Sequence, residues 1–294
     1  MTVQQKAFKS RRRYNQWVTN QTLEDFALRY TPVSARRWSA KRVVMTALSA
    51  ITFLALEAIG GALTLTYGFN YVVVAVILVS IIIFALSMPI AINAAKNGLD
   101  IDLLTRGAGF GYLGSTVTSL IYASFTFIFF ALEAAIMAMA LNMLFGLPLH
   151  FGYLIGSVVV IPLVTWGFTF ISRFQQFTQF CWLALQLLPF IFILIREHHV
   201  LQNWIDFPGF ITARDGSFDF LQLGAVCSVL LSLVSQVGEQ VDQVRFLPKP
   251  QHPARWRWYG AVIAAGPGWV VIGAIKILLG SFLAVLAFNY GLGA

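Results

Sequence analysis

The stretches Leu56-Glu57-Ala58-Ile59-Gly60-Gly61 and Gly238-Glu239-Gln240-Val241-Asp242 lie in two long apolar segments, residues 44–69 and 219–243. Each stretch places a carboxylate close to glycine among apolar residues. An ionised side chain inside a membrane costs a few kcal/mol or more, so it needs a polar cavity, a partner or a bound ion. Helices interrupted at corresponding places in two halves of a membrane protein point to a transporter's binding site. The two stretches therefore predict a solute-binding membrane domain.

The composition of the chain is that of an integral membrane protein. Hydrophobic residues make up 58% and charged residues 11% of the 294 residues, and the mean hydropathy is +0.76. Soluble domains carry roughly 25% charged residues. Apolar runs of about 20 residues predict membrane helices. We therefore predict an all-α membrane protein with a basic tail, residues 1–43, and a transmembrane domain, residues 44–294, with seven spans: 44–69, 71–95, 115–145, 151–171, 176–196, 219–243 and 257–289.

The net charge of +8 follows the membrane and does not indicate nucleic-acid binding. If the N-terminus is cytoplasmic, most of the 20 Lys and Arg residues fall on the cytoplasmic side of the seven spans. This distribution obeys the positive-inside rule and predicts a cytoplasmic N-terminus and an external C-terminus. The tail is interpreted either as a surface-lying amphipathic helix or as a disordered basic arm. The apolar residues on which the helical interpretation depends are Trp17, Leu23, Phe26, Ala27 and Tyr30.

Glu57 is the strongest candidate for a functional residue, because nearly uninterrupted apolar sequence surrounds it from Val44 to Leu65. Gly60 and Gly61 follow within one turn and are expected to open the helix there. A broken first helix would expose backbone carbonyls to a cation and place Glu57 at a polar cavity. The alternatives are a structural ion pair and a protonated carboxyl group bonded to a neighbouring helix.

The third span carries a second candidate, Glu133, with Phe129 four residues before it. Residues four apart share one helix face, so the two predict an aromatic platform beside a hydrogen-bonding group. That combination suits a flat ligand with polar edges. Because phenylalanine is abundant in this chain, a lipid-facing position for Phe129 remains an alternative.

The sixth span ends in further polar residues, of which Gln236 and Glu239 are interpreted as ligand groups. Asp242 and Arg245 are three residues apart and are expected to form a structural ion pair at the helix end. Lys276 lies near the middle of the seventh span, after the helix-disrupting sequence Gly266-Pro267-Gly268. A lone cation at that depth needs a carboxylate, and Lys276 is expected to balance the charge of Glu57, Glu133 or Glu239.

Enzymatic and metal chemistry have no support in the sequence. Cys181 and Cys227 have neither CxxC nor Cys/His spacing, so neither a disulfide framework nor a metal site is expected. The four histidines lie at span ends or in loops, and no Ser/His/Asp or Cys/His constellation stands out. We expect no catalytic residue, no metal and no cofactor other than a coupling Na⁺ or H⁺.

The stretch Ala95-Lys96-Asn97-Gly98-Leu99-Asp100-Ile101-Asp102-Leu103-Leu104-Thr105-Arg106 resembles the nucleobase-cation symporters of the purine, cytosine and hydantoin permease family. That family has a similar Ala-Arg-Tyr-Gly-x-x-x-x-x-Leu-x-Arg-x-x-Phe-Gly-x-x-Gly-Ser stretch. The match continues here in Phe110, Gly111, Gly114 and Ser115. In hydropathy the likeness spans most of residues 40–289.

The resemblance implies a LeuT-type fold of two inverted five-helix repeats with broken first and sixth helices. This chain would supply the first repeat and two helices of the second, as an incomplete part of a longer product. Phe129 and Glu133 stand where the family has a ring-stacking Trp and a hydrogen-bonding Gln. Glu239, Asp242, Arg245 and Phe246 resemble the family's Asn-x-x-Asp-x-x-Arg-aromatic pattern, and Leu233 stands where the family often has a second stacking Trp.

Carboxylates in place of the family's amides favour a cationic or amine-bearing solute, or coupling to protons. The leading hypothesis is therefore a transporter of the bacterial inner membrane that couples a small polar, nucleobase-like or amine-bearing solute to a cation or proton. The alternative is a permease-like input domain of a sensor histidine kinase, fused to or associated with its signalling domain. A membrane scaffold without a ligand is the third hypothesis, which the cost of burying three carboxylates disfavours.

Overall fold

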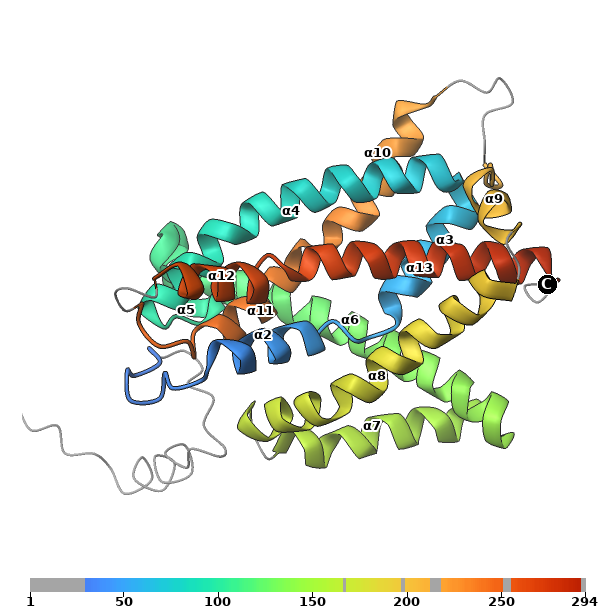
Figure 1. Cartoon of the computed structure of the whole chain (residues 1–294). Helices are drawn as coiled ribbons and strands as arrows, with labels where there is room; N and C mark the ends of the chain where they lie inside the picture. Colours follow the sequence, from blue (N-terminus) through green and yellow to red (C-terminus); the bar gives the residue numbers. More distant parts are fainter. Residues whose placement is uncertain (1–29, 166–167, 197–198, 212–217, 251–254, 292–294) are drawn as a thin grey trace, which may run out of the picture.

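The computed structural model describes residues 30–165, 168–196, 199–211, 218–250 and 255–291, in which every regular element is a helix (Figure 1). The amphipathic helix predicted in the tail falls outside the described residues, except for Tyr30. The elements in chain order are α2 (Ala40–Ser49), α3 (Ala55–Tyr67), α4 (Phe69–Asn97), α5 (Ile101–Thr105), η1 (Arg106–Phe110), α6 (Gly111–Phe145), α7 (Leu149–Thr165), α8 (Phe168–Arg196), α9 (Val200–Ile205), α10 (Phe220–Leu231), η2 (Ser232–Ser235), α11 (Gln236–Val244), α12 (Arg255–Ala265) and α13 (Trp269–Asn289).

Within the described residues, five helical segments are long and apolar enough to cross a membrane. They are Phe69–Asn97, Ile101–Phe145, Phe170–Arg196, Phe220–Val244 and Arg255–Asn289. The apolar part of α7, Leu149–Pro162, is shorter, and the predicted span 44–69 is divided between α2 and α3. The chain therefore has the helices of a multi-pass membrane protein.

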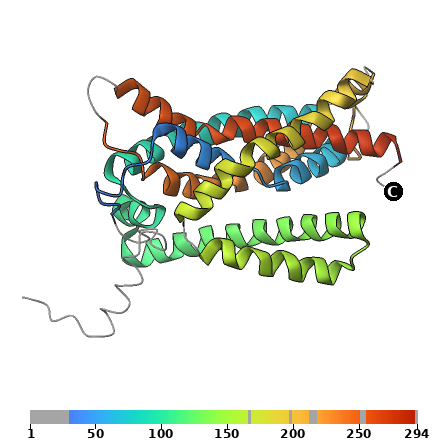
Figure 2. The same cartoon turned by 60° about the horizontal axis from the view of Figure 1, so that its bottom comes forward.

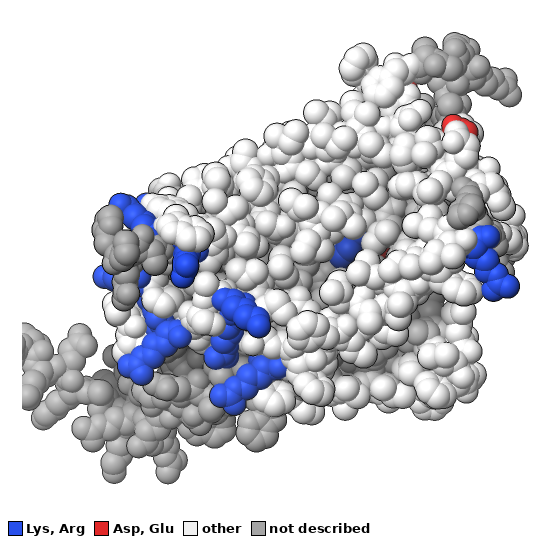
Figure 3. All heavy atoms as spheres, viewed as in Figure 1, with Lys and Arg blue, Asp and Glu red and all other residues white. Residues whose placement is uncertain are grey.

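The described chain runs back and forth between two ends of the molecule (Figure 1). One end carries the first turns of α2 and α12 together with α5, and we call it the basic end. Lys and Arg side chains gather at the basic end in the space-filling view, whereas the middle of that face is almost entirely uncharged (Figure 3). This segregation of charge is the one expected of a protein whose apolar middle lies in lipid.

The predicted break in the first span is confirmed, but its position differs from the prediction. The helix is interrupted over residues 50–54, between α2 and α3, which is before Glu57. Gly60 and Gly61 do not open the helix, because both lie buried inside α3. We call residues 50–54 the first-span break.

Gly60 and Gly280 allow α3 and α13 to touch through their backbones. A Cβ atom on Gly60 would overlap the carbonyl oxygen of Ile277, and one on Gly280 would overlap the backbone of Glu57. Small residues at a helix interface permit this close approach in membrane proteins. Thr64 adds a hydrogen bond across the same interface, from its hydroxyl to Ser281 Oγ, at 2.6 Å. The glycines that seemed to open a helix therefore pack two helices together.

The predicted break in the sixth span is replaced by a tightened turn. The segment passes from α10 through the 3₁₀ turn η2 into α11, and the residues flanking η2, Leu231 and Gln236, have helical backbone angles. Gly238 lies inside α11, where a Cβ would come within 2.9 Å of the Tyr122 ring. A sharper interruption lies in the last segment at residues 266–268, between α12 and α13, where Pro267 has no N–H to donate.

The predicted spans 151–171 and 176–196 leave residues 172–175 between them, but α8 already begins at Phe168. Ser172, Arg173 and Gln175 were therefore placed outside the predicted helices. They occupy the first turns of α8, where Ser172 bonds to the side chain of Thr46 in α2. Polar residues in a membrane helix are tolerated when a neighbouring helix supplies hydrogen bonds.

The buried core lies among α2, α3, α4, η2, α10, α11, α12 and α13. The α6–α7 hairpin lies to one side of this core (Figure 2). Gly152 of α7 is seated directly on Ala138 of α6, so the two helices of the hairpin pack closely on each other. Large apolar side chains are exposed along most of α6 and α7, as befits surfaces in contact with lipid.

Two arginines hold the basic end together. Arg36, before α2, donates to the carbonyl oxygens of Leu247 (2.9 Å), Lys96 (3.1 Å) and Ala95, and so ties the ends of α4 and α11 to the start of α2. Burial lowers the pKa of Arg36, although a guanidinium titrates so high that it stays charged at neutral pH. Arg245 forms the ion pair expected with Asp242, at 4.0 Å, and a second with Asp100, at 3.8 Å.

Substitution of Gly60 by Ala tests the contact between α3 and α13. Because the added Cβ would meet a backbone carbonyl, which cannot rotate away, the helices must separate, and we expect a loss of about 2 kcal/mol of stability. Thermal unfolding in detergent measures the change. The matched control is Gly224→Ala in α10, where the Cβ would meet open space. Equal unfolding temperatures for the two variants would contradict a close helix contact at Gly60.

Candidate functional site

Lys276 of α13 and Glu57 of α3 form an ion pair in the interior of the protein. The ammonium group Nζ hydrogen-bonds to Glu57 Oε1. Only 2% of the Lys276 side chain and 10% of the Glu57 side chain are exposed. The contact between the backbones of α3 and α13 brings the two side chains within reach of each other. The expectation that Lys276 pairs with a carboxylate is confirmed, and its partner is Glu57.

Helix α8 completes the surroundings of this ion pair. Gln186 Nε2 donates to the same oxygen of Glu57 at 2.7 Å. The ammonium of Lys276 also lies 4.9 Å from the centre of the Trp182 ring, a favourable cation–π distance. Trp182 in turn donates its indole N–H to the carbonyl oxygen of Thr52, at 3.0 Å. The Trp182 side chain therefore contacts both the ammonium of Lys276 and a backbone carbonyl of the first-span break.

Glu133 of α6 reaches the other side of the break. Its Oε1 accepts a hydrogen bond from the backbone N–H of Ala55 at 2.7 Å. Ala55 begins α3, and the residue before it, Leu54, offers no side-chain cap. The first N–H groups of a helix lack partners within the helix and favour a negative charge. Glu133 thus caps α3 from a different helix, and it also interacts electrostatically with Lys276.

Phe129 lies one turn before Glu133 and packs against the same break. Its ring meets the Phe53 ring edge to face at 5.2 Å and lies 4.4 Å from the Phe125 ring. Phe129 therefore packs partly on protein, and its position near Glu133 agrees with the expected aromatic platform. The structure brings Glu57, Glu133, Phe129 and Lys276 together around the first-span break.

Gln236 and Glu239 belong to a second polar cluster, which the sequence analysis had assigned to the same site. Gln236 Nε2 donates to Glu239 Oε2 at 2.5 Å. Asp242, one turn further on, accepts from the backbone N–H of Ile101 at 3.4 Å. These partners come from α5 and α11 near the basic end, and no described contact joins Glu239 to Glu57. The reason is that Glu239 lies beyond the turn η2, close to the end of its span.

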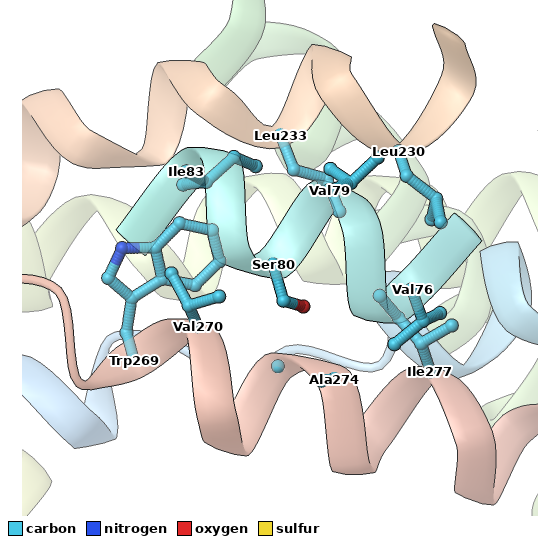
Figure 4. Close-up of a pocket in the computed structure, with 11 residues that line it drawn as sticks. Val76, Val79, Ser80, Ile83, Leu230, Leu233, Trp269, Val270, Ala274 and Ile277 are labelled. Carbon is cyan, nitrogen blue, oxygen red and sulfur yellow. The ribbon is translucent and has the colours of Figure 1, made fainter. Parts of the chain in front are cut away.

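Two cavities of the described protein are unsuited to a polar solute. One, of about 20 Å³, lies between α4, α10, η2 and α13, with Ser80 and Trp269 among otherwise apolar residues (Figure 4). Such a volume holds one water molecule at most. The other, of about 180 Å³, is lined solely by apolar residues of α8, α9 and α13, including Phe190, Trp204 and Phe282. Neither lining includes Glu57, Glu133 or Lys276.

The contribution of α8 to the site was not predicted from the sequence. Its polar side chains recur three or four residues apart and so share one helix face: Ser172, Gln176, Gln179, Trp182 and Gln186. This periodic stripe is readable in the sequence, but the segment was interpreted as a plain apolar span. Four of these residues contact α2, α3 or the break between them, through Thr46, Ser49, Thr52 or Glu57.

One polar atom at the site has no hydrogen-bond partner in the described part of the chain. It is Glu57 Oε2, which is buried although Oε1 of the same carboxylate has two donors. A buried acceptor without a donor costs about 1–3 kcal/mol. A buried ion pair also adds little stability, because desolvation offsets its attraction. The arrangement can thus accept a proton, a cation or a donor group of a solute at Oε2.

Comparison of the chain with protein-family models, with curated proteins and with solved structures gave no match. The function therefore has to be inferred from the chemistry of the site itself.

Replacement of Lys276 by Met tests the ion pair. It leaves the carboxylate of Glu57 buried without a counter-charge, and we expect a loss of about 3 to 5 kcal/mol of stability. The double variant Glu57→Gln/Lys276→Met removes both charges and should recover most of this loss. Thermal unfolding in detergent of the two single variants and the double variant gives the coupling energy. Additive effects would contradict a direct pair.

Proposed function

We propose that this protein is a membrane transporter that binds a small polar solute at the first-span break and couples its movement to a cation or a proton. The observation that carries the proposal is the Glu57–Lys276 ion pair, buried in the interior and flanked by Gln186. Ionisable groups buried within membrane helices generally mark solute, ion or proton pathways. Here they stand beside an interrupted helix, as in the binding sites of many transporters.

The surrounding groups indicate the chemistry of the solute. Glu133 can exchange its bond to Ala55 N–H for one to an amine or ring N–H group of a ligand. The freed N–H would then be available to a solute acceptor atom. Phe129 and Phe53 offer aromatic surface next to these polar groups. A flat, nucleobase-like or amine-bearing solute fits this combination.

Glu57 is the group best placed for coupling. Its Oε2 has no donor in the described structure, and a proton on the carboxyl group or a bound Na⁺ would satisfy it. Neutralising Glu57 would also release Lys276 to interact with Glu133. The occupancy of the coupling site and that of the solute site would then depend on each other.

The placement in the membrane follows from the same features. We propose that α2–α3 and α7 cross the bilayer together with the five long segments, which gives seven spans. The basic end then faces the cytoplasm of a bacterial cell, in agreement with the positive-inside rule. The broken first span supports the LeuT-type architecture that the loop 95–106 suggests. In that architecture the seven spans would correspond to the first five-helix repeat and two helices of the second.

The second candidate function is a sensor, in which the same site biases the output of a histidine kinase. The network at the basic end favours this candidate. Arg36 ties the start of α2 to the ends of α4 and α11, so a shift of the first-span break on binding would reach the basic end, where an associated signalling domain on the cytoplasmic side would contact it. Binding without transport distinguishes the sensor from the transporter.

Substitution of Glu133 tests the proposed site. We expect Glu133→Ala to abolish uptake of labelled nucleobases and small amines by proteoliposomes with an imposed proton gradient, because it removes the acceptor next to the break. Glu239→Gln, in the second polar cluster, is the matched control and should retain uptake. Undiminished uptake by correctly inserted Glu133→Ala would remove Glu133 from the site. Binding of a compound without uptake by the unaltered protein would favour the sensor.

A further inference from the structure

A row of polar contacts joins α8 to the first span along its length. At the basic end, Arg42 Nε donates to Ser172 Oγ at 3.1 Å, and Ser172 Oγ lies 2.8 Å from Thr46 Oγ1. Further along, Ser49 Oγ donates to Gln179 Oε1 at 2.8 Å. These side chains belong to α2 and α8, two helices that are packed directly on each other.

The row continues past the first-span break to the ion pair. Trp182 donates to the carbonyl oxygen of Thr52, and Gln186 donates to Glu57. The polar seam, as we call this row, therefore extends from Arg42 to Glu57 between α8 on one side and α2, the break and α3 on the other. Each step along α8 is three, four or seven residues, so the contacts follow one another on one helix face.

Three buried polar atoms in or beside the seam have no hydrogen-bond partner among the described residues. They are Arg42 Nη2, Gln175 Oε1 and Glu57 Oε2. Gln175 belongs to the same face of α8 as Ser172 and Gln179. Buried polar groups in proteins are nearly always satisfied by protein atoms or by ordered water. The unpaired atoms at both ends of the seam therefore need hydrogen-bond donors and acceptors that the described residues do not provide.

Lipid cannot supply those donors and acceptors. The opposite face of α8 is apolar and strongly exposed, with Phe177 84% and Leu185 69% exposed. No water is available from this side, because the hydrocarbon core excludes it. The basic end is the open side of the seam, since Arg42 is only partly buried there.

We infer that the polar seam binds a chain of water molecules that connects the aqueous phase at the basic end with Glu57. This inference deepens the proposed function and rests on it for the role of Glu57 in coupling. Protons then reach Glu57 from the basic end, and the far end of the molecule has no part in this path. Arg42 stands at the entrance, where its Nη2, which has no partner among the described residues, can donate to the first water molecule of the chain.

Cysteine labelling tests the water path without any solute. Native Cys181 and Cys227 are first replaced by Ser, and single cysteines are then introduced as Ser172→Cys, Thr46→Cys and Ser49→Cys. The probe is a charged, membrane-impermeant methanethiosulfonate reagent. It reacts with the thiolate, which forms in water and is suppressed in apolar surroundings. Phe177→Cys, on the lipid-facing side of α8 at a depth between Ser172 and Gln179, is the matched control.

We expect the three seam cysteines to react about ten times faster than Phe177→Cys, because only they have access to water that supports the thiolate. In sealed vesicles they should react from one side, the side on which a marker cysteine at the basic end, Arg257→Cys, also reacts. Gln179→Cys, on α8 opposite Ser49, provides a second variant if Ser49→Cys fails to fold.

The water path would be overturned if Ser49→Cys and Gln179→Cys reacted as slowly as Phe177→Cys while Arg257→Cys reacted at its normal rate. Reaction from the side opposite to Arg257→Cys would also overturn it. The outcome is separate from that of the proposed function. Normal labelling in a protein that takes up no solute would count against transport alone, and uptake without labelling would count against the water path alone.

Discussion

The contact between the backbones of α3 and α13 is the constraint on which the rest of the structure depends. Gly60 and Gly280 bring the two helices closer than any side chain would allow. At that separation the ammonium of Lys276 reaches the carboxylate of Glu57, and neither charge is left alone in an apolar interior. Had either glycine carried a side chain, the helices would stand further apart, and two buried charges would each need another partner.

The first-span break lies directly before the part of α3 that contacts α13. Glu57 is held against α13, and the chain before it leaves the helical path over residues 50–54 between α2 and α3. The break leaves the N–H of Ala55 and the carbonyl of Thr52 without helical partners. Glu133 of α6 and Trp182 of α8 supply them. Three helices far apart in the sequence are thereby held around one interruption of the backbone.

The polar groups form two systems with different character. The basic end is a network of arginines with carbonyl and carboxylate partners, which fixes how the helix ends meet. The site at the break is sparser, with an unpaired carboxylate oxygen and a cap that comes from a different helix. Both systems contain buried polar atoms without a partner among the described residues, Gln240 Nε2 and Oε1 and Gln243 Oε1 in α11 and Glu57 Oε2 at the break. A partly satisfied site can exchange its partners for those of a ligand, which is consistent with the solute binding proposed at the break.

The sequence by itself determined that the protein is helical and apolar enough for a membrane, that Glu57 and Lys276 are unusual, and that Gly266-Pro267-Gly268 disrupts the last span, but it placed the break of the first span at Gly60 and Gly61, where the helix continues. These features are local, since composition, a lone charge and a Gly-Pro-Gly run act wherever they occur in the chain. Only the tertiary structure decided which carboxylate Lys276 would meet, that Gly60 and Gly61 pack helices together, and that Glu239 lies in a separate cluster. It also decided that the polar stripe of α8 faces the first span. Each of these depends on the distance and the membrane depth at which two helices that are distant in sequence meet. Packing of the whole helix bundle sets this arrangement, and residues that are neighbours in the chain do not.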